Sequence, residues 1–246
     1  MSLSAGDGRM SQDRREFLGL LAAAGLTPVL DGRTEGRKDG KSAPPPPAPS
    51  ALPSFRHSVS PAWDMSWTSR LSGLYRAVFD SPKAQDGGEL WRAATWKSQV
   101  MDVYGAKQED VNAVLVVRHG GIPLVMDDEF WRRHEIGKKR KIKDPMTGKR
   151  AEGNPVLSYE GRKDIPAEMA GASLVEFLKR GGTVLACNFA FGMMVHYEAE
   201  ADKEHAKDAR ERALAHLVPG VVLQPSGFFA LLEAQRAGCH LFTAGE

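Results

Sequence analysis

Residues with reactive or polar side chains, together with two glycines, lie at the ends of four of the apolar runs in this sequence. They are Asp80, His119, Gly120, Cys187, Asn188, Ser226 and Gly227. Continuous apolar runs of this kind are typical of parallel strands that are buried on both faces. The carboxyl ends of parallel strands meet at one edge of a sheet, and ligands of open parallel sheets bind outside that edge. The sequence therefore predicts a ligand site there, with these seven residues in it.

Cys187 is the candidate catalytic residue. It ends the run TVLAC, and a helical region follows it near Phe189. A thiol at the start of a helix is stabilised as a thiolate by the helix dipole and by free backbone N–H groups, which makes it a nucleophile. His119 follows another strand and can add a hydrogen-bond donor. The alternative interpretation is a buried cysteine that packs as a small apolar residue.

Three other candidates also have structural alternatives. His119 can orient a substrate or bind a metal, or it can be a hydrogen-bonded residue at a strand end. Asp80 precedes a Ser-Pro pair and can cap a turn. Ser226 is expected to cap the helix that follows it, because no Gly-x-Ser-x-Gly motif marks it as a nucleophile.

The usual motifs for cofactors and metals do not occur in this sequence. Gly120-Gly121 allows a ligand to approach the backbone, but there is no Gly-x-Gly-x-x-Gly and no Walker motif, so no cofactor is predicted. The spacing of His196, His205 and His216 matches no metal-binding helix, so these histidines are expected at the surface and no metal site is predicted.

Strand and helix signals alternate along the chain. The expected strands are 74–79, 111–117, 183–187, 221–223 and 239–243, and the expected helices are 89–104, 122–130, 174–178, 206–217 and 228–237. Strand, helix and strand at this spacing require right-handed crossovers between parallel strands. The predicted fold class is therefore α/β, a single domain with a mostly parallel five-stranded sheet flanked by helices. Cys239 starts the last strand, at the edge opposite Cys187, so the two cysteines are not expected to form a disulfide.

The chain is expected to have three parts. Residues 1–30 resemble a twin-arginine export signal, with Arg14-Arg15 before a short, mildly apolar run; an amphipathic helix is the alternative. Residues 31–54 form a Pro/Gly-rich linker, and 55–246 form the folded domain. A polar stretch near 137–157 is interpreted as a long loop, which in a compact domain is usually functional or mobile. The signal implies a periplasmic protein exported in the folded state, tethered to the membrane if the signal stays uncut.

Composition limits the classes of partner. The formal net charge of +2 does not indicate nucleic-acid binding. The basic run at 138–143 is interpreted as a solvated loop, and contact with an anionic ligand or a lipid surface is the alternative. Two cysteines are too few for a disulfide framework or a four-cysteine zinc site. No apolar run is long enough to span a bilayer, so membrane contact is expected only through an uncut signal segment.

Three segments carry a resemblance to the DsrE/DsrF-like family. Residues 113–124 are similar to the second strand and following turn of that family, 183–187 to a third strand that ends in a characteristic cysteine, and 218–238 to the last helix and its approach. The resemblance covers about 70–246 and implies a DsrE-like α/β fold that assembles into trimers or hexamers. In sulfur-relay members the matching cysteine carries a persulfide, a role that would fall on Cys187. Those members are cytoplasmic and lack the stretch 137–157.

We therefore expect an exported, non-catalytic module for small-ligand binding or assembly. The alternative is a thiol-based sulfur carrier with a persulfide on Cys187, supported by His119 and Asn188. A metal- or haem-associated redox accessory protein is a third reading, suggested only by the type of export signal. The expected partners are other copies of the chain and a small molecule or a sulfur-carrying protein, and whether the protein is an enzyme is left open.

Overall fold

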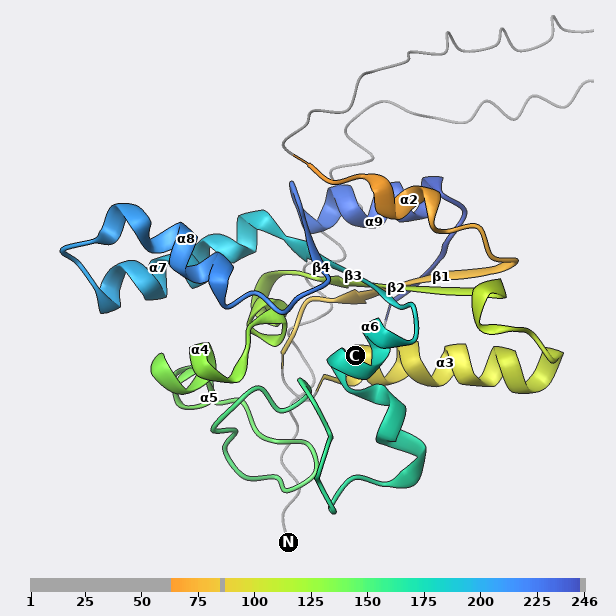
Figure 1. Cartoon of the computed structure of the whole chain (residues 1–246), viewed down its shortest axis with the longest axis horizontal. Helices are drawn as coiled ribbons and strands as arrows, with labels where there is room; N and C mark the ends of the chain where they lie inside the picture. The colour runs from red at the N-terminus through yellow and green to blue at the C-terminus, as the bar shows by residue number, and fades with distance from the viewer. Residues whose placement is uncertain (1–62, 85–86, 244–246) are drawn as a thin grey trace, which may run out of the picture. The chain divides into compact units, whose positions relative to one another are not determined.

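A parallel five-stranded sheet forms the centre of the domain in the computed structural model, which describes residues 63–84 and 87–243 (Figure 1). The strands are β1 (Tyr75–Ser81), β2 (Val111–Val117), β3 (Thr183–Cys187), β4 (Val221–Gln224) and β5 (His240–Phe242). All neighbouring strands run parallel, in the order β4-β3-β2-β1-β5. The predicted α/β fold class is confirmed. The segments expected as signal and linker, 1–30 and 31–54, lie outside the described residues.

The central strands are buried on both faces because helices cover both sides of the sheet. All five residues of β3 are buried, and so are six of the seven residues of β2. Alternate residues of β2 enter different clusters: Ala113 and Leu115 pack on one face, and Val114 and Val116 pack on the other.

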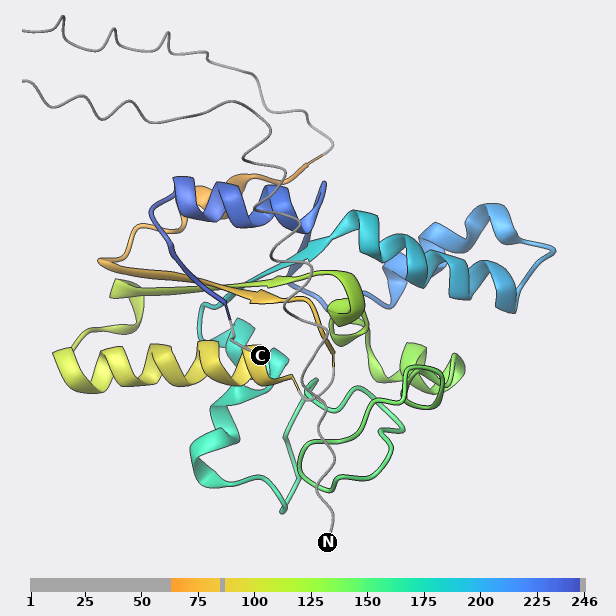
Figure 2. The ribbon, with the colours of Figure 1, turned by 180° about the vertical axis from the view of Figure 1, so that it is seen from behind.

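The smaller cluster lies between the sheet and two helices, α2 (Ser66–Ser69) and α9 (Gly227–Arg236), drawn above the sheet in Figure 2. Ala230 and Ala234 lie one helical turn apart on α9 and pack with the buried Trp67 of α2. Small residues at these positions allow α9 to approach the sheet closely.

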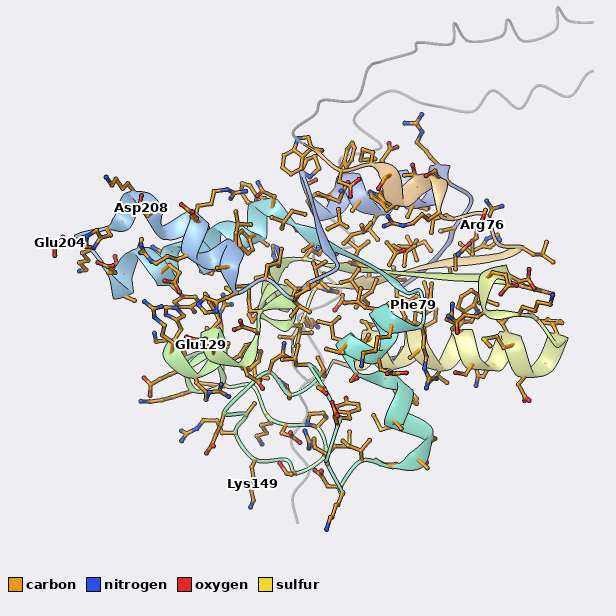
Figure 3. All side chains as sticks on the ribbon, viewed as in Figure 1. Arg76, Phe79, Glu129, Lys149, Glu204 and Asp208 are labelled. Atoms are coloured by element: carbon orange, nitrogen blue, oxygen red, sulfur yellow. The ribbon has the colours of Figure 1, made fainter. Side chains whose placement is uncertain are left out.

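The larger cluster occupies the opposite face. It packs against α3 (Gly88–Tyr104), η2 (His119–Val125), α4 (Asp128–Arg133), α6 (Leu174–Lys179), α7 (Asn188–Ala201) and α8 (Ala209–Ala215). The other short elements are η1 (Gln108–Asp110), α5 (Ile136–Lys139), η3 (Ala167–Ala172) and η4 (Ala206–Asp208). Phe79, labelled in Figure 3, points from β1 into this cluster and contacts Trp96 of α3. Helices α7 and α8 pack side by side and extend beyond the sheet, with Glu204 and Asp208 near their far end (Figures 1 and 3).

The prediction of a single helix at 122–130 is wrong. The chain instead forms the 3-10 helix η2, an extended segment at Met126, and then α4. Pro123 lacks the N–H that an α-helix needs, and the Asp127 carboxylate accepts a hydrogen bond from the Phe130 N–H (2.8 Å), which starts a new helix. Ile122 and Phe130 are nevertheless both buried.

The stretch 137–157 packs onto the larger cluster. It begins within α5, and a single bridge joins Lys143 and Arg150. Ile142 and Val156 are buried in the core, and the Asn154 side chain donates hydrogen bonds to two backbone carbonyls of the preceding segment, at 2.8 and 2.7 Å. This stretch is therefore anchored to the core by buried side chains and hydrogen bonds, although its composition is polar.

Candidate functional site

A cavity of about 720 Å³ lies at the carboxyl ends of β2, β3 and β4. Five of the seven residues predicted for the site line it, namely His119, Gly120, Cys187, Ser226 and Gly227. They meet because residue 117 of β2 pairs with 186 of β3, and 187 pairs with 224 of β4, so the strand ends lie level. The parallel register thus gathers residues that are far apart in the sequence.

Asp80 and Asn188 do not line this cavity. The Asp80 carboxylate accepts two hydrogen bonds from Arg118, both of 2.7 Å, and is therefore neutralised by that side chain. The Asn188 side chain accepts a hydrogen bond of 2.7 Å from Arg210 of α8. Asp80 acts on the site through Arg118, and Asn188 connects α7 to α8.

Cys187 is the N-cap of α7. Its Sγ atom accepts a hydrogen bond from the backbone N–H of Ala190 at 3.4 Å. The residue is only 6% exposed, and it lines the cavity. The α7 helix is fourteen residues long, so its positive dipole end lies at the sulfur.

Arg118 is a cationic residue beside Cys187 on the same edge of the sheet. It directly follows β2, and one further step of the β2–β3 pairing places it beside Cys187. The hydrogen bonds to Asp80 raise the pKa of Arg118, burial opposes this effect, and the charges of Asp80 and of a Cys187 thiolate raise it further. Arg118 is therefore a permanent cation in the lining of the cavity.

His119 has an uncommon backbone conformation, with φ of +52°. Gly121, two residues after His119, lies very close to the end of β1. A Cβ atom at Gly121 would be 2.5 Å from the Ser81 carbonyl oxygen. The left-handed turn at His119 allows this close approach and leaves the His119 side chain exposed at the cavity.

Ser226 is the N-cap of α9, as the sequence indicated. Its Oγ atom accepts a hydrogen bond from the Phe229 N–H at 3.1 Å. Gly227 then lies against Arg118, and a Cβ atom at Gly227 would be 2.6 Å from the Arg118 Cδ atom. The start of α9 therefore fixes the position of Arg118.

Two cationic lining residues were not among the predicted site residues. Arg118 directly follows the strand at 111–117 and adjoins His119, so its position indicates a site residue as much as that of His119 does. Arg140 belongs to the basic run that was interpreted as a solvated loop. That interpretation is wrong for Arg140, because it is only partly exposed, lines the cavity and donates from Nε to the Tyr197 hydroxyl at 3.2 Å.

Large apolar side chains also surround the cavity. Phe189 and Met193 lie one turn apart on α7, and Phe228 lies on the first turn of α9. Phe189 is 88% exposed and Phe228 is 66% exposed, although both side chains are strongly apolar. The available signal was a phenylalanine in the first turn after each polar strand end, in NFAF and SGFF.

A buried charged cluster lies outside this cavity, between α4, α7 and α8. The Glu198 carboxylate is fully buried and accepts hydrogen bonds from His134 (2.7 Å) and Arg212 (3.1 Å). Burial would raise the pKa of Glu198, but the hydrogen bonds from His134 and Arg212 hold it below its ordinary value. Burial lowers the pKa of His134 below its ordinary value, against the opposing effect of the hydrogen bond to Glu198.

His216 is not the surface residue that its spacing suggested. Its side chain is mostly buried, and Nδ1 lies 3.0 Å from the Asp127 carboxylate. His196 and His205 are exposed, as predicted.

The two cysteines lie at opposite edges of the sheet, as predicted. Cys239 precedes β5 and is buried, and both cysteines are free thiols. Burial raises the pKa of the Cys239 thiol to about 11. Arg76, labelled in Figure 3, donates a hydrogen bond of 3.0 Å to the Ala237 carbonyl near this edge.

Within residues 63–84 and 87–243, no group of three or more His, Cys, Asp or Glu side chains is arranged to hold a metal ion. Over the same residues, no helix has both the length and the apolar character needed to cross a membrane. Comparisons of the chain with protein-family models, with curated proteins and with solved structures found no match.

Proposed function

We propose that this protein is a small-ligand-binding module and that the ligand occupies the cavity at the carboxyl ends of β2, β3 and β4. The cavity itself is the observation that supports this function. Its volume of about 720 Å³ falls in the range of small-molecule sites, roughly 300–1,000 Å³. Its position, outside the carboxyl ends of parallel strands, is the usual place for ligands in such sheets.

The lining of the cavity suits a bound organic molecule. Phe189, Met193 and Phe228 offer apolar surface, and His119 and Arg140 offer a few polar contacts that can fix an orientation. Exposure of such large apolar side chains is unfavourable in water, so a bound molecule that covers them gains free energy by burying them.

Native mass spectrometry of the full chain, together with a thermal-shift screen of small metabolites, tests this function. We expect a retained mass or a ligand-dependent rise in Tm, because a ligand that binds only the folded state stabilises it. The variant Phe189→Ala/Phe228→Ala should keep its fold and lose the effect. The proposal fails if the wild-type chain retains nothing and no compound shifts its Tm.

A second function is supported by Cys187. Its Sγ atom accepts a hydrogen bond from the Ala190 N–H at the start of α7, and the residue lines the cavity beside Arg118. In this function the Cys187 thiolate attacks the outer sulfur of a donor persulfide. A bond then forms between Cys187 Sγ and that sulfur, the S–S bond of the donor breaks, and the donor leaves as a thiolate. The resemblance to DsrE/DsrF-like proteins supports the same role.

Intact mass after treatment with a persulfide donor tests the carrier function. We expect the chain to gain one sulfur atom that a reducing agent removes, and the Cys239→Ser variant to behave like the wild type. The Cys187→Ser variant should gain none. Uptake that is unchanged in Cys187→Ser would exclude this function.

The same proposal has three further parts. The chain has a DsrE-like fold, it assembles into homo-trimers or homo-hexamers, and it is exported to the periplasm by the twin-arginine route. The three segments 113–124, 183–187 and 218–238 support the first two, and the Arg14-Arg15 segment supports the third. Light scattering of the purified chain tests the assembly state. Fractionation of cells that carry Arg14→Lys/Arg15→Lys tests the route, because this variant should remain in the cytoplasm.

A further inference from the structure

The charged side chains that line the ligand cavity are all basic. Arg118 and Arg140 line it together with His119, and no Asp or Glu of the described residues does so. In a chain with a nearly balanced formal charge of +2, a site with basic and no acidic side chains is a local departure. It indicates that the cavity favours a negatively charged group.

The two arginines differ in how far they are neutralised. Arg118 pairs with Asp80, so its charge is largely compensated before any ligand arrives. Arg140 donates from Nε to the uncharged Tyr197 hydroxyl, and among the described residues no carboxylate lies within ion-pair distance of its guanidinium. Arg140 therefore has its full charge available to a ligand.

Two helix N-termini add to the positive electrostatic potential in the cavity. The N-cap residues of α7 and α9, Cys187 and Ser226, both line the cavity. These helices are fourteen and ten residues long, so each places a positive dipole end at the site. The dipoles alone define no site, but they act in the same direction as Arg140.

The rest of the lining requires an apolar part in the ligand. Phe189 and Phe228 are the most exposed aromatic side chains of the cavity, and Met193 lies one turn from Phe189. The Phe228 ring also lies 5.4 Å from the guanidinium carbon of Arg118, which is within the range of a cation–π contact. A small inorganic anion would leave these rings in water.

We infer that the ligand is an organic acid, with an anionic group bound by Arg140 and an apolar or aromatic body packed against Phe189 and Phe228. This inference rests on the proposed ligand-binding function and specifies the chemical class of the ligand. Charge-assisted hydrogen bonds from a guanidinium are worth about twice as much as neutral ones, which gives the anionic group its preference.

Two fluorescent dyes with similar apolar bodies test the inference on the full chain. The first is 8-anilino-1-naphthalenesulfonate, which carries a sulfonate, and the second is N-phenyl-1-naphthylamine, which is neutral. We expect the wild type to bind the sulfonate about tenfold more tightly, with a preference that decreases as salt is added. Arg140→Gln should lose this preference and keep its affinity for the neutral dye.

Matched variants separate the possible failures. Arg236→Gln, which removes an exposed arginine at the far end of α9, should bind both dyes as the wild type does. Phe189→Ala/Phe228→Ala should bind both dyes weakly. If the two dyes bind equally well and Arg140→Gln changes neither, the cavity binds ligands but the inferred class is wrong. If neither dye binds the wild type, the ligand-binding function fails as well.

Discussion

Arg118 donates two hydrogen bonds of 2.7 Å to the carboxylate of Asp80 and so joins the carboxyl end of β2 to that of β1. Both side chains are mostly buried, and Gly227 holds Arg118 from the other side. Arg118, which lines the ligand cavity, is therefore held between the Asp80 carboxylate and the start of α9. This geometry gives the first two predictions.

Asp80→Asn should lower the free energy of unfolding by roughly 2–3 kcal/mol, because it leaves the charge of Arg118 poorly compensated in a mostly buried position. Urea titration measures this as a lower midpoint with an unchanged slope. Glu233→Gln is the control, because its partner Arg236 is exposed, and it should cost less than about 0.5 kcal/mol. An equal cost for both variants would contradict the role given to Asp80.

Gly227→Ala and Gly192→Ala make the same chemical change on different helices and should have opposite effects. A Cβ atom at Gly227 would be 2.6 Å from Arg118, whereas a Cβ atom at Gly192 of α7 meets nothing within 4 Å. Gly192→Ala should stabilise the protein by about 0.5–1 kcal/mol, because alanine favours a helix. Gly227→Ala should destabilise it and weaken ligand binding. Differential scanning calorimetry checks both signs, and a stabilised Gly227→Ala would show that Arg118 is free to move.

The His134–Glu198 pair should make stability depend on pH. The pKa of His134 is below its ordinary 6.5 because of burial, so the unfolded chain takes up this proton before the folded chain does. Stability from His134 is therefore lost as pH falls below about 6.5, with a slope of at most about 1.4 kcal/mol per pH unit. The pKa of Glu198 is also lowered, so its contribution is lost only below its ordinary 4.5.

Urea titrations between pH 7 and pH 5 measure this slope. His134→Gln should flatten it, because glutamine takes up no proton. His205→Gln should leave it unchanged, because His205 is exposed at the far end of α7 and α8. A wild-type slope that His134→Gln does not alter would assign the proton uptake to another group.

The two cysteines should differ in reactivity in the folded protein. Cys239 is buried, and burial raises its pKa to about 11, so at pH 8 it remains a protonated thiol. Cys187 accepts a hydrogen bond from the Ala190 N–H and lines an open cavity. A short treatment with iodoacetamide, followed by peptide mass mapping, should find the label on Cys187 first. Both cysteines should react in urea, and labelling of Cys239 before Cys187 in the native protein would contradict this assignment.

The central strands were predictable because strands that are buried on both faces consist mostly of apolar residues. The runs at 111–117 and 183–187 are apolar except at Asn112 and Thr183, and the structure confirms both to the residue. The expected end of β1 at Phe79 was wrong by two residues. Asp80 and Ser81 look like a turn, but they continue the ladder opposite Val116 and Val117.

The site was only partly predictable because its charges are set by distant partners. Asp80 is buried since Arg118, far along the chain, compensates it. Arg140 lies in a basic run typical of a solvated loop, but its side chain lines the cavity and donates to the Tyr197 hydroxyl of α7. The left-handed backbone of His119 likewise follows from the approach of Gly121 to β1, which no local pattern encodes.

Strand β5 has a consequence for the order in which the molecule is completed. Its three residues, His240–Phe242, pair with β1, which is formed by residues 75–81 near the other end of the domain. Before β5 pairs, β1 is joined to β2 along one edge and its other edge is open. A truncation before residue 240 would leave that edge of β1 unpaired and prone to intermolecular strand pairing.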